Sequence, residues 1–242
     1  MATAASCGTL NAPKLGLPLK ATVLDTKGEL PARMFIAKGA SAKMRQRFTT
    51  DVESITMMAI LRPVTTGLAE SRNMPEILVL GLHVPHDGAV PVEVIDHIAA
   101  QRPGGIIFVC VRDGGTLTGE TSETSGEQCA LAVRRHVPVK PGHPQVTKVH
   151  AGAWRPSADV HLTVGGTTMA ELWDSLCAQA IMGDTDGANL DVRIARRDRV
   201  ARLEAELTKA KGAHARAKTT EQRNAAYAKM ATIRAELTKL GA

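Results

Sequence analysis

Residues 76–84 read EILVLGLHV, and residues 106–111 read IIFVCV. Each run is almost continuously apolar, a pattern typical of a strand that is covered on both faces rather than on one. Between the two runs, Pro91 stands where the first turn of a helix is expected, and Ile95 and Ile98 give that helix an apolar side. Strand, helix and strand within about 35 residues predict a β-α-β unit with two parallel strands at the centre of the fold.

Further elements are expected on both sides of this unit. The patterns predict short strands at 21–24, 129–139 and 160–164, a helix over 41–62 capped by Ser41, and a helix from Thr167 onward. Residues 1–18 are rich in Ala, Thr, Gly and Pro and predict a flexible N-terminus. The fold class expected is α/β, with a mixed β-sheet and flanking helices over 19–186 and a basic, coiled-coil-like helical hairpin over 188–242.

Composition excludes some classes of protein. The chain of 242 residues has only three Phe, two Trp and one Tyr, too few for the stacking platforms that bind single-stranded nucleic acid. Its four cysteines form no C-x-x-C pair, so we expect buried neutral thiols rather than a zinc or redox site. No apolar run approaches the roughly 18 residues of a membrane span, and no leader pattern begins the chain. A cytoplasmic protein without membrane contact is expected.

The positive charge is concentrated at the C-terminus. Residues 191–242 hold thirteen Lys or Arg against six Asp or Glu, a net charge of +7. The other 190 residues hold seventeen against eighteen, a net of −1, which together give +6. The C-terminal stretch also lacks proline and cysteine and is rich in residues that form helices readily. These features predict a near-neutral body with a basic helical appendage.

Two apolar seams predict that this appendage is a pair of helices. Residues 200, 203, 207 and 210 repeat at helical spacing, and so do residues 227, 230, 233, 237 and 240. Such narrow, heptad-like seams are buried when two helices pack together. We expect a turn within 211–220 and helices of about 20 residues each. The alternative is one long helix that pairs with a second copy of the chain, which would make a homodimer.

The same segment contains the candidate binding residues. We expect a partner or nucleic acid to contact Arg193, Arg196, Arg197, Arg199, Arg202, Lys209, Lys211, Arg216, Lys218 and Arg223. Lys and Arg are sufficient for contact with phosphates and do not require aromatic residues. Three interpretations stay open at this point: a solvated helix face, a docking surface for an acidic protein, and contact with a phosphate backbone.

Catalytic signals are weak. The chain has no phosphate-binding loop, no dinucleotide fingerprint, no H-E-x-x-H and no G-x-S-x-G motif, and we expect no cofactor and no metal. His83, His86 and Asp87 follow a strand but are more typical of a turn than of a metal site. A divergent metal-dependent nuclease or hydrolase is the alternative function. Its candidate residues are Glu53, Glu76, Asp113 and Lys140, which do not form the compact acidic pair with lysine that such sites favour.

An ordered set of motifs runs along the chain. The set comprises Pro31…Lys38, Phe48-x-x-x-Val52-x-x-Ile55, Leu61-x-Pro63-x-Thr65, Glu76-Ile77, Ile95…Pro103…Ile106-Ile107-Phe108, Trp154, Leu162…Gly165…Glu171-Leu172 and Gln222-Arg223-Asn224 leading into residues 225–240. In this order and spacing the set resembles DUF4391, a bacterial family of unknown function. The shortage of aromatic residues and the His- and Pro-rich segment 140–160 depart from the family pattern.

This resemblance implies a role but no catalytic residues. Family members resemble accessory components encoded beside helicases and DNA methyltransferases of restriction-like or phage-defence systems, so a helicase or methyltransferase is the implied protein partner. The resulting hypothesis is a non-catalytic accessory protein of a DNA-processing complex. It would dock through its basic C-terminal helices onto that partner or onto a nucleic-acid backbone.

Overall fold

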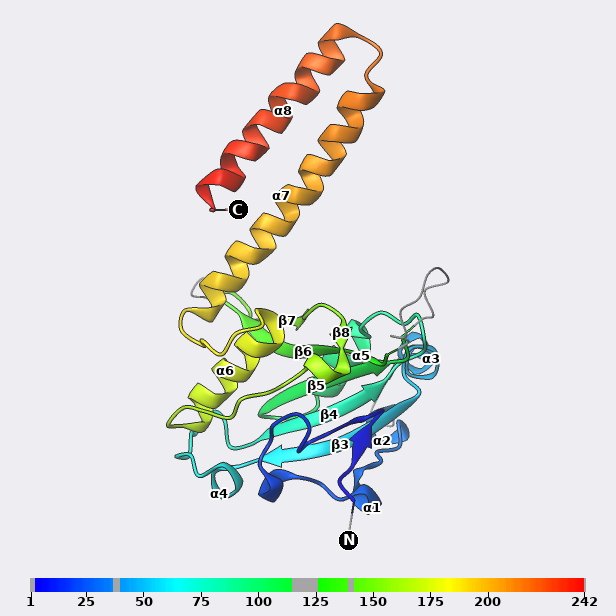
Figure 1. Ribbon diagram of the computed structural model, residues 1–242, viewed down its shortest axis with the longest axis vertical. Helices are drawn as coiled ribbons and strands as arrows, with labels where there is room; N and C mark the ends of the chain where they lie inside the picture. The colour runs from blue at the N-terminus through cyan, green and yellow to red at the C-terminus, as the bar shows by residue number, and fades with distance from the viewer. Residues whose placement is uncertain (1–2, 37–39, 115–125, 139–141, 242) are drawn as a thin grey trace. The chain divides into compact units, whose positions relative to one another are not determined.

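The parallel pairing of β4 (Ile77–His83) with β5 (Gly105–Arg112) forms the centre of the sheet. The helix α5 (Val92–Ala99) connects the two strands, which confirms the β-α-β prediction. Within the described residues the sheet has six strands in the order β3-β4-β5-β6-β7, with β8 added beside β6. Every other pair of neighbouring strands in this sheet is antiparallel (Figure 1). The predicted α/β class with a mixed sheet is therefore confirmed.

The computed structural model describes residues 3–36, 40–114, 126–138 and 142–241. The other strands are β1 (Ser6–Cys7), β2 (Leu10–Asn11), β3 (Ser54–Leu61), β6 (Gln128–Val137), β7 (Val146–Ala151) and β8 (Arg155–Pro156). The other helices are α1 (Asp25–Gly28), α2 (Arg33–Ile36), α3 (Ala42–Asp51), α4 (Pro63–Thr66), α6 (Met169–Ile181), α7 (Leu190–Arg216) and α8 (Thr220–Lys239). The chain divides into two compact units, Met1–Ala188 and Asn189–Ala242.

One face of the sheet is covered by α5 and α3. Alternate residues of the two central strands point to this face, among them Leu80 and Phe108, which are at most 2% exposed. They pack with Ile95 and Ile98 of α5 and with Phe48 of α3. This arrangement follows from the period of two in a strand, because every second side chain of an apolar run needs a cover on the same face.

The opposite face is covered by the N-terminal segment and α6. A Cβ atom added to Gly81 of β4 would lie 2.4 Å from the Cβ of Cys7, so β1 passes directly over the strand. Likewise, a Cβ added to Gly105 would lie 2.4 Å from the ring of Trp173 in α6. Glycine at these two positions lets a second element approach the sheet more closely than any side chain would permit.

The described part of the N-terminal segment, over which flexibility is expected for 1–18, packs on the sheet. The described residues from 3 onward include five that are at most 3% exposed, namely Ala5, Cys7, Leu10, Ala12 and Leu15. The turn between β1 and β2 is also anchored, because Thr9 donates hydrogen bonds from its backbone nitrogen and its hydroxyl to the carboxylate of Glu127, each 2.7 Å long. The small residues of this segment allow it to lie flat on the sheet, a role that composition alone does not distinguish from flexibility.

The helix expected over 41–62 covers only half of that range. Ser41 does cap α3, its hydroxyl accepting a hydrogen bond from the backbone nitrogen of Met44 at 3.2 Å. The helix ends at Asp51, however, and residues 54–61 form β3, antiparallel to β4. The apolar residues of β3 pack on both sides of the sheet, and pairing with β4 outweighs the helical spacing of Val52, Ile55 and Ala59.

Two strand predictions are wrong, and β7 is among the observed strands that were not predicted. Residues 160–164 form no strand, although Leu162 is 1% exposed and its backbone nitrogen donates to the carbonyl of Leu15 at 2.8 Å. Residues 21–24 make only isolated bridges to neighbouring segments. The segment 146–151, which lies in the His- and Pro-rich segment 140–160, forms β7. The strand predicted over 129–139 is confirmed as β6, which ends at Val137.

The four cysteines are free and buried, as predicted. Burial raises the pKa of Cys7 and of Cys129 to about 12, and it raises the pKa of Cys110 as well. These thiols are therefore neutral near pH 7. None of the helices in the described ranges is both long and apolar enough to cross a membrane.

Replacing Gly81 with alanine should lower the free energy of unfolding by about 1–3 kcal/mol, because the added methyl group overlaps Cys7. The double variant with Gly81→Ala and Cys7→Gly should lose less free energy of unfolding than the sum of the two single losses, since the smaller residue at position 7 relieves the clash. Urea unfolding measures both effects. Gly165→Ala is the control, because a Cβ there meets nothing within 4 Å. Equal stability of Gly81→Ala and the parent chain would contradict the docking of β1 on β4.

Stability should decrease at alkaline pH because of the buried thiols. In the unfolded chain a thiol ionises near 9.0, whereas folded Cys7 and Cys129 keep their protons to about 12. The contribution of these two protonated thiols to the free energy of unfolding is thus complete below pH 9 and is lost as the pH rises toward 12. The urea midpoint measured at intervals between pH 8 and pH 12 should fall less steeply in Cys7→Ala than in the parent chain. Parallel pH profiles would contradict the assignment to this thiol.

Candidate functional site

The C-terminal unit is an antiparallel helical hairpin rather than one continuous helix. The chain reverses between Arg216, the last residue of α7, and Thr220, the first of α8, inside the predicted range 211–220. Thr219 caps α8 by accepting a hydrogen bond from the backbone nitrogen of Gln222 at 3.2 Å. In return, the side chain of Gln222 accepts from the backbone nitrogen of Lys218 at 3.1 Å. These local bonds define where the hairpin turns.

The predicted seam holds the two helices together with one exception. Its buried members are Leu203, Ala210, Met230, Ile233 and Leu237, flanked by the partly buried Val200, Leu207 and Leu240. The exception is Tyr227, which is 61% exposed. Ala226, four residues before Met230, is half-buried.

The arginines nearest the start of α7 are engaged within the chain. Arg196 donates to the carbonyl oxygen of Leu240 at 2.8 Å and so satisfies the C-terminal end of α8. Arg199 forms an ion pair with Glu236 of α8. Arg197 pairs with the adjacent Asp198 at 3.0 Å, and Arg193 is half-buried and likewise engaged. These four predicted contact residues thus have structural roles.

The other six candidate residues form what we call the distal basic surface. It consists of Arg202, Lys209, Lys211, Arg216, Lys218 and Arg223. All six are exposed, and within the described part of the chain none of their side chains makes a hydrogen bond or an ion pair. Residues 200–223 contain these six cations against three Glu, a net charge of +3. The structure therefore divides the predicted site into a bonded proximal half and an available distal half.

Three members of this surface share one side of α7. Arg202, Lys209 and Arg216 succeed one another at intervals of seven residues, which places them on one flank at steps of about 10 Å. We call these three residues the α7 stripe. Residues 211, 218 and 223 lie close to the turn in sequence. A line of unpaired cations on a helix is suited to contact with phosphates or carboxylates.

The residues considered for a nuclease site are not brought together. Glu76 precedes β4 and accepts two hydrogen bonds from the guanidinium of Arg62, at 2.9 and 2.7 Å. Asp113 comes directly after the end of β5, and because β4 and β5 are parallel, it lies at the opposite end of the sheet from Glu76. Seven residues of strand separate the two ends by about 23 Å. Lys140 lies outside the described residues.

The histidines likewise do not form a metal site. Nδ1 of His83 lies 2.6 Å from a carboxylate oxygen of Glu53, and Nδ1 of His86 lies 3.1 Å from Asp87. His136, His143 and His161 are exposed, whereas His150 is buried in β7. Among the described residues, no group of three or more His, Cys, Asp or Glu side chains is arranged to hold a metal ion.

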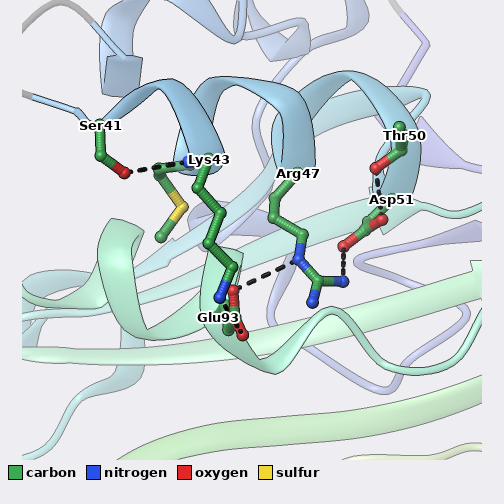
Figure 2. A network of polar contacts seen from close by, with 7 residues as sticks. Ser41, Lys43, Arg47, Thr50, Asp51 and Glu93 are labelled. Atoms are coloured by element: carbon green, nitrogen blue, oxygen red, sulfur yellow. Dashed lines mark hydrogen bonds and ion pairs between the residues drawn. The ribbon is translucent and has the colours of Figure 1, made fainter.

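A polar network joins α3 to α5 beside a cavity of about 540 Å³ (Figure 2). Arg47 lies between Asp51, at 3.1 Å, and Glu93 of α5, at 3.3 Å. Lys43 approaches the same Glu93 at 3.5 Å. The hydrogen bond to Asp51 and the charge of Glu93 raise the pKa of Arg47. All four charged groups are thus paired with one another, and the network braces α3 against α5.

The observed class of protein is an α/β protein with a mixed sheet that carries a basic antiparallel helical hairpin. The model of one family, the domain of unknown function DUF4391, matches residues 15–237. The chain belongs to this family, and the match includes both compact units. No curated protein and no solved structure matches the chain.

Replacing Leu203 with alanine should destabilise the hairpin by about 2–4 kcal/mol, because the side chain is 1% exposed in the seam. Tyr227→Ala is the matched control, since Tyr227 is exposed and its loss should change stability by less than about 0.5 kcal/mol. Thermal unfolding of the full chain, monitored by helical circular dichroism, measures both. Comparable destabilisation by the two changes would contradict the packing of α7 on α8 through this seam.

Proposed function

We propose that this chain is a non-catalytic interaction protein of a cytoplasmic DNA-processing complex, and that it docks through the distal basic surface. The observation that carries the proposal is the set of six exposed cations without ion pairs on one half of the hairpin. Paired arginines gain little from a new anionic partner, because their charge is already compensated. Unpaired ones bind an anionic backbone with release of its counterions.

A nucleic-acid backbone is the partner that this surface fits best. Phosphate contact needs exposed Lys and Arg and no particular base-reading geometry, and the α7 stripe offers these groups along a stiff helix. The distal basic surface itself contains no aromatic residue, which disfavours stacking on single strands. Docking of this kind holds a protein on DNA without sequence preference. Recognition of a sequence or catalysis would then belong to other members of the complex.

The triple change Arg202→Gln, Lys209→Gln and Arg216→Gln should weaken binding to duplex DNA at low salt, whatever its sequence. Each lost phosphate contact removes about 0.9 from the slope of log affinity against log salt, so the slope should fall by about 2.7. Fluorescence anisotropy of a labelled duplex, measured over a range of salt concentrations, gives both quantities.

The matched control removes three exposed cations from the body of the protein, with Lys20→Gln, Lys27→Gln and Arg33→Gln. It changes the net charge equally and should leave the affinity nearly unchanged. Equal losses in the two variants would show that net charge alone matters and would overturn the proposal. Unchanged duplex binding in the stripe variant, together with loss of a co-purifying protein, would assign the surface to a protein partner instead.

A further inference from the structure

The flank of α8 that carries Tyr227 is a second candidate surface. Arg223, Tyr227 and Arg234 are separated by four and seven residues, so at 100° per residue they lie within about 40° of one another around the helix. All three side chains are exposed, and none makes a hydrogen bond or an ion pair with any other described residue. We call these three residues the α8 flank. Its arginines are about 16 Å apart along the axis.

The α8 flank has no carboxylate of its own helix beside it. The acidic residues of α8 are Glu221 and Glu236. Glu236 pairs with Arg199 of α7, and because it is nine residues from Tyr227, it lies on the opposite side of α8. The residues that do share the side of Tyr227 are small and neutral, namely Thr220, Ala231 and Thr238. The flank is therefore positive, with one aromatic ring at its centre.

The α8 flank faces away from the α7 stripe. The ion pair between Arg199 and Glu236 marks one side of the hairpin, and Arg202 is three residues from Arg199 and so lies on that same side. Tyr227 is diametrically opposite Glu236 around α8. The α7 stripe and the α8 flank share no residue and can therefore be changed separately. Arg223 belongs to both the α8 flank and the distal basic surface, whereas Tyr227 and Arg234 belong to the flank alone.

We propose that the α8 flank binds an acidic α-helix of a partner protein. A tyrosine between two arginines is the kind of residue set that contributes most of the energy at protein interfaces. Each guanidinium can donate two parallel hydrogen bonds to one carboxylate. The small residues beside the ring let a second helix approach closely. Arg223 and Arg234 are eleven residues apart, which is about three turns of helix. The partner helix therefore presents two Asp or Glu side chains at the same spacing, with an apolar residue against Tyr227.

Nucleic acid fits this flank less well. A single aromatic ring is no platform for successive bases, and contact with duplex phosphates makes no use of the ring. A helix of a partner protein uses all three side chains, the arginines for its carboxylates and the ring for its apolar side. The exposed ring is thus the observation that selects a protein partner.

The test uses the full chain and a labelled, Ala-based helical peptide with two Glu at the spacing of Arg223 and Arg234 and a Leu between them. Fluorescence anisotropy should show binding that Tyr227→Ala weakens about thirtyfold, the effect of removing an interface hot spot. The pair Arg223→Gln and Arg234→Gln should weaken it about tenfold. Tyr227→Phe keeps the ring and should bind within about threefold of the parent chain.

The α7 stripe variant is the control for charge and should bind the acidic peptide within about twofold of the parent chain. A peptide with Lys in place of both Glu should not bind. Absence of binding by the acidic peptide, or equal loss in the α7 and α8 variants, would overturn the inference. So would weaker duplex binding in Tyr227→Ala, which would assign the flank to nucleic acid. Conversion of a dimer to a monomer by Tyr227→Ala in light scattering would instead assign it to a second copy of the chain.

Discussion

The parallel pair of β4 and β5 imposes the main constraint on the body of the protein. Both strands are apolar on both faces, so neither can be exposed to water on either side without a large loss of hydrophobic stabilisation. The chain meets this demand with α5 and α3 on one face and with the N-terminal segment and α6 on the other. Glycines 81 and 105 mark where the second cover comes closest. The described N-terminal residues supply part of that cover.

In the hairpin, one set of residues holds the two helices together and another set carries the exposed positive charge. A narrow apolar seam holds α7 to α8, with Leu203 and Ile233 among its buried members. The proximal arginines strengthen that pairing through Glu236 and the end of α8. The cations nearer the turn make no such bonds in the part of the chain that is described. Because their charge is not paired within the described residues, it is on this half that we propose docking of an anionic partner.

Much of this arrangement could be predicted from local patterns, and the failures have physical causes. The two buried strands, the strand over 129–139, the cap at Ser41 and the seams of the hairpin all depend on neighbouring residues, whose periodicity the sequence displays directly. The range 41–62 has the pattern of one helix because β3 carries apolar residues at helical spacing, and only its pairing with β4 shows otherwise. Within the candidate site, the pattern could identify the basic residues but could not sort them. Arg199 and Arg202 look alike until Glu236 is placed beside the first and not the second.

The class of fold, the division of charge and the existence of two helical seams can be read without any coordinates, because each is a property of composition or of short-range period. The three-dimensional packing was needed to show which cations are available to bind, that Tyr227 lies outside the seam, and that Glu76 and Asp113 are too far apart to share a site. These outcomes depend on residues distant in sequence. Arg199 meets a carboxylate on another helix, the packing of α7 on α8 leaves Tyr227 exposed, and parallel pairing sends two carboxylates to opposite ends of a sheet.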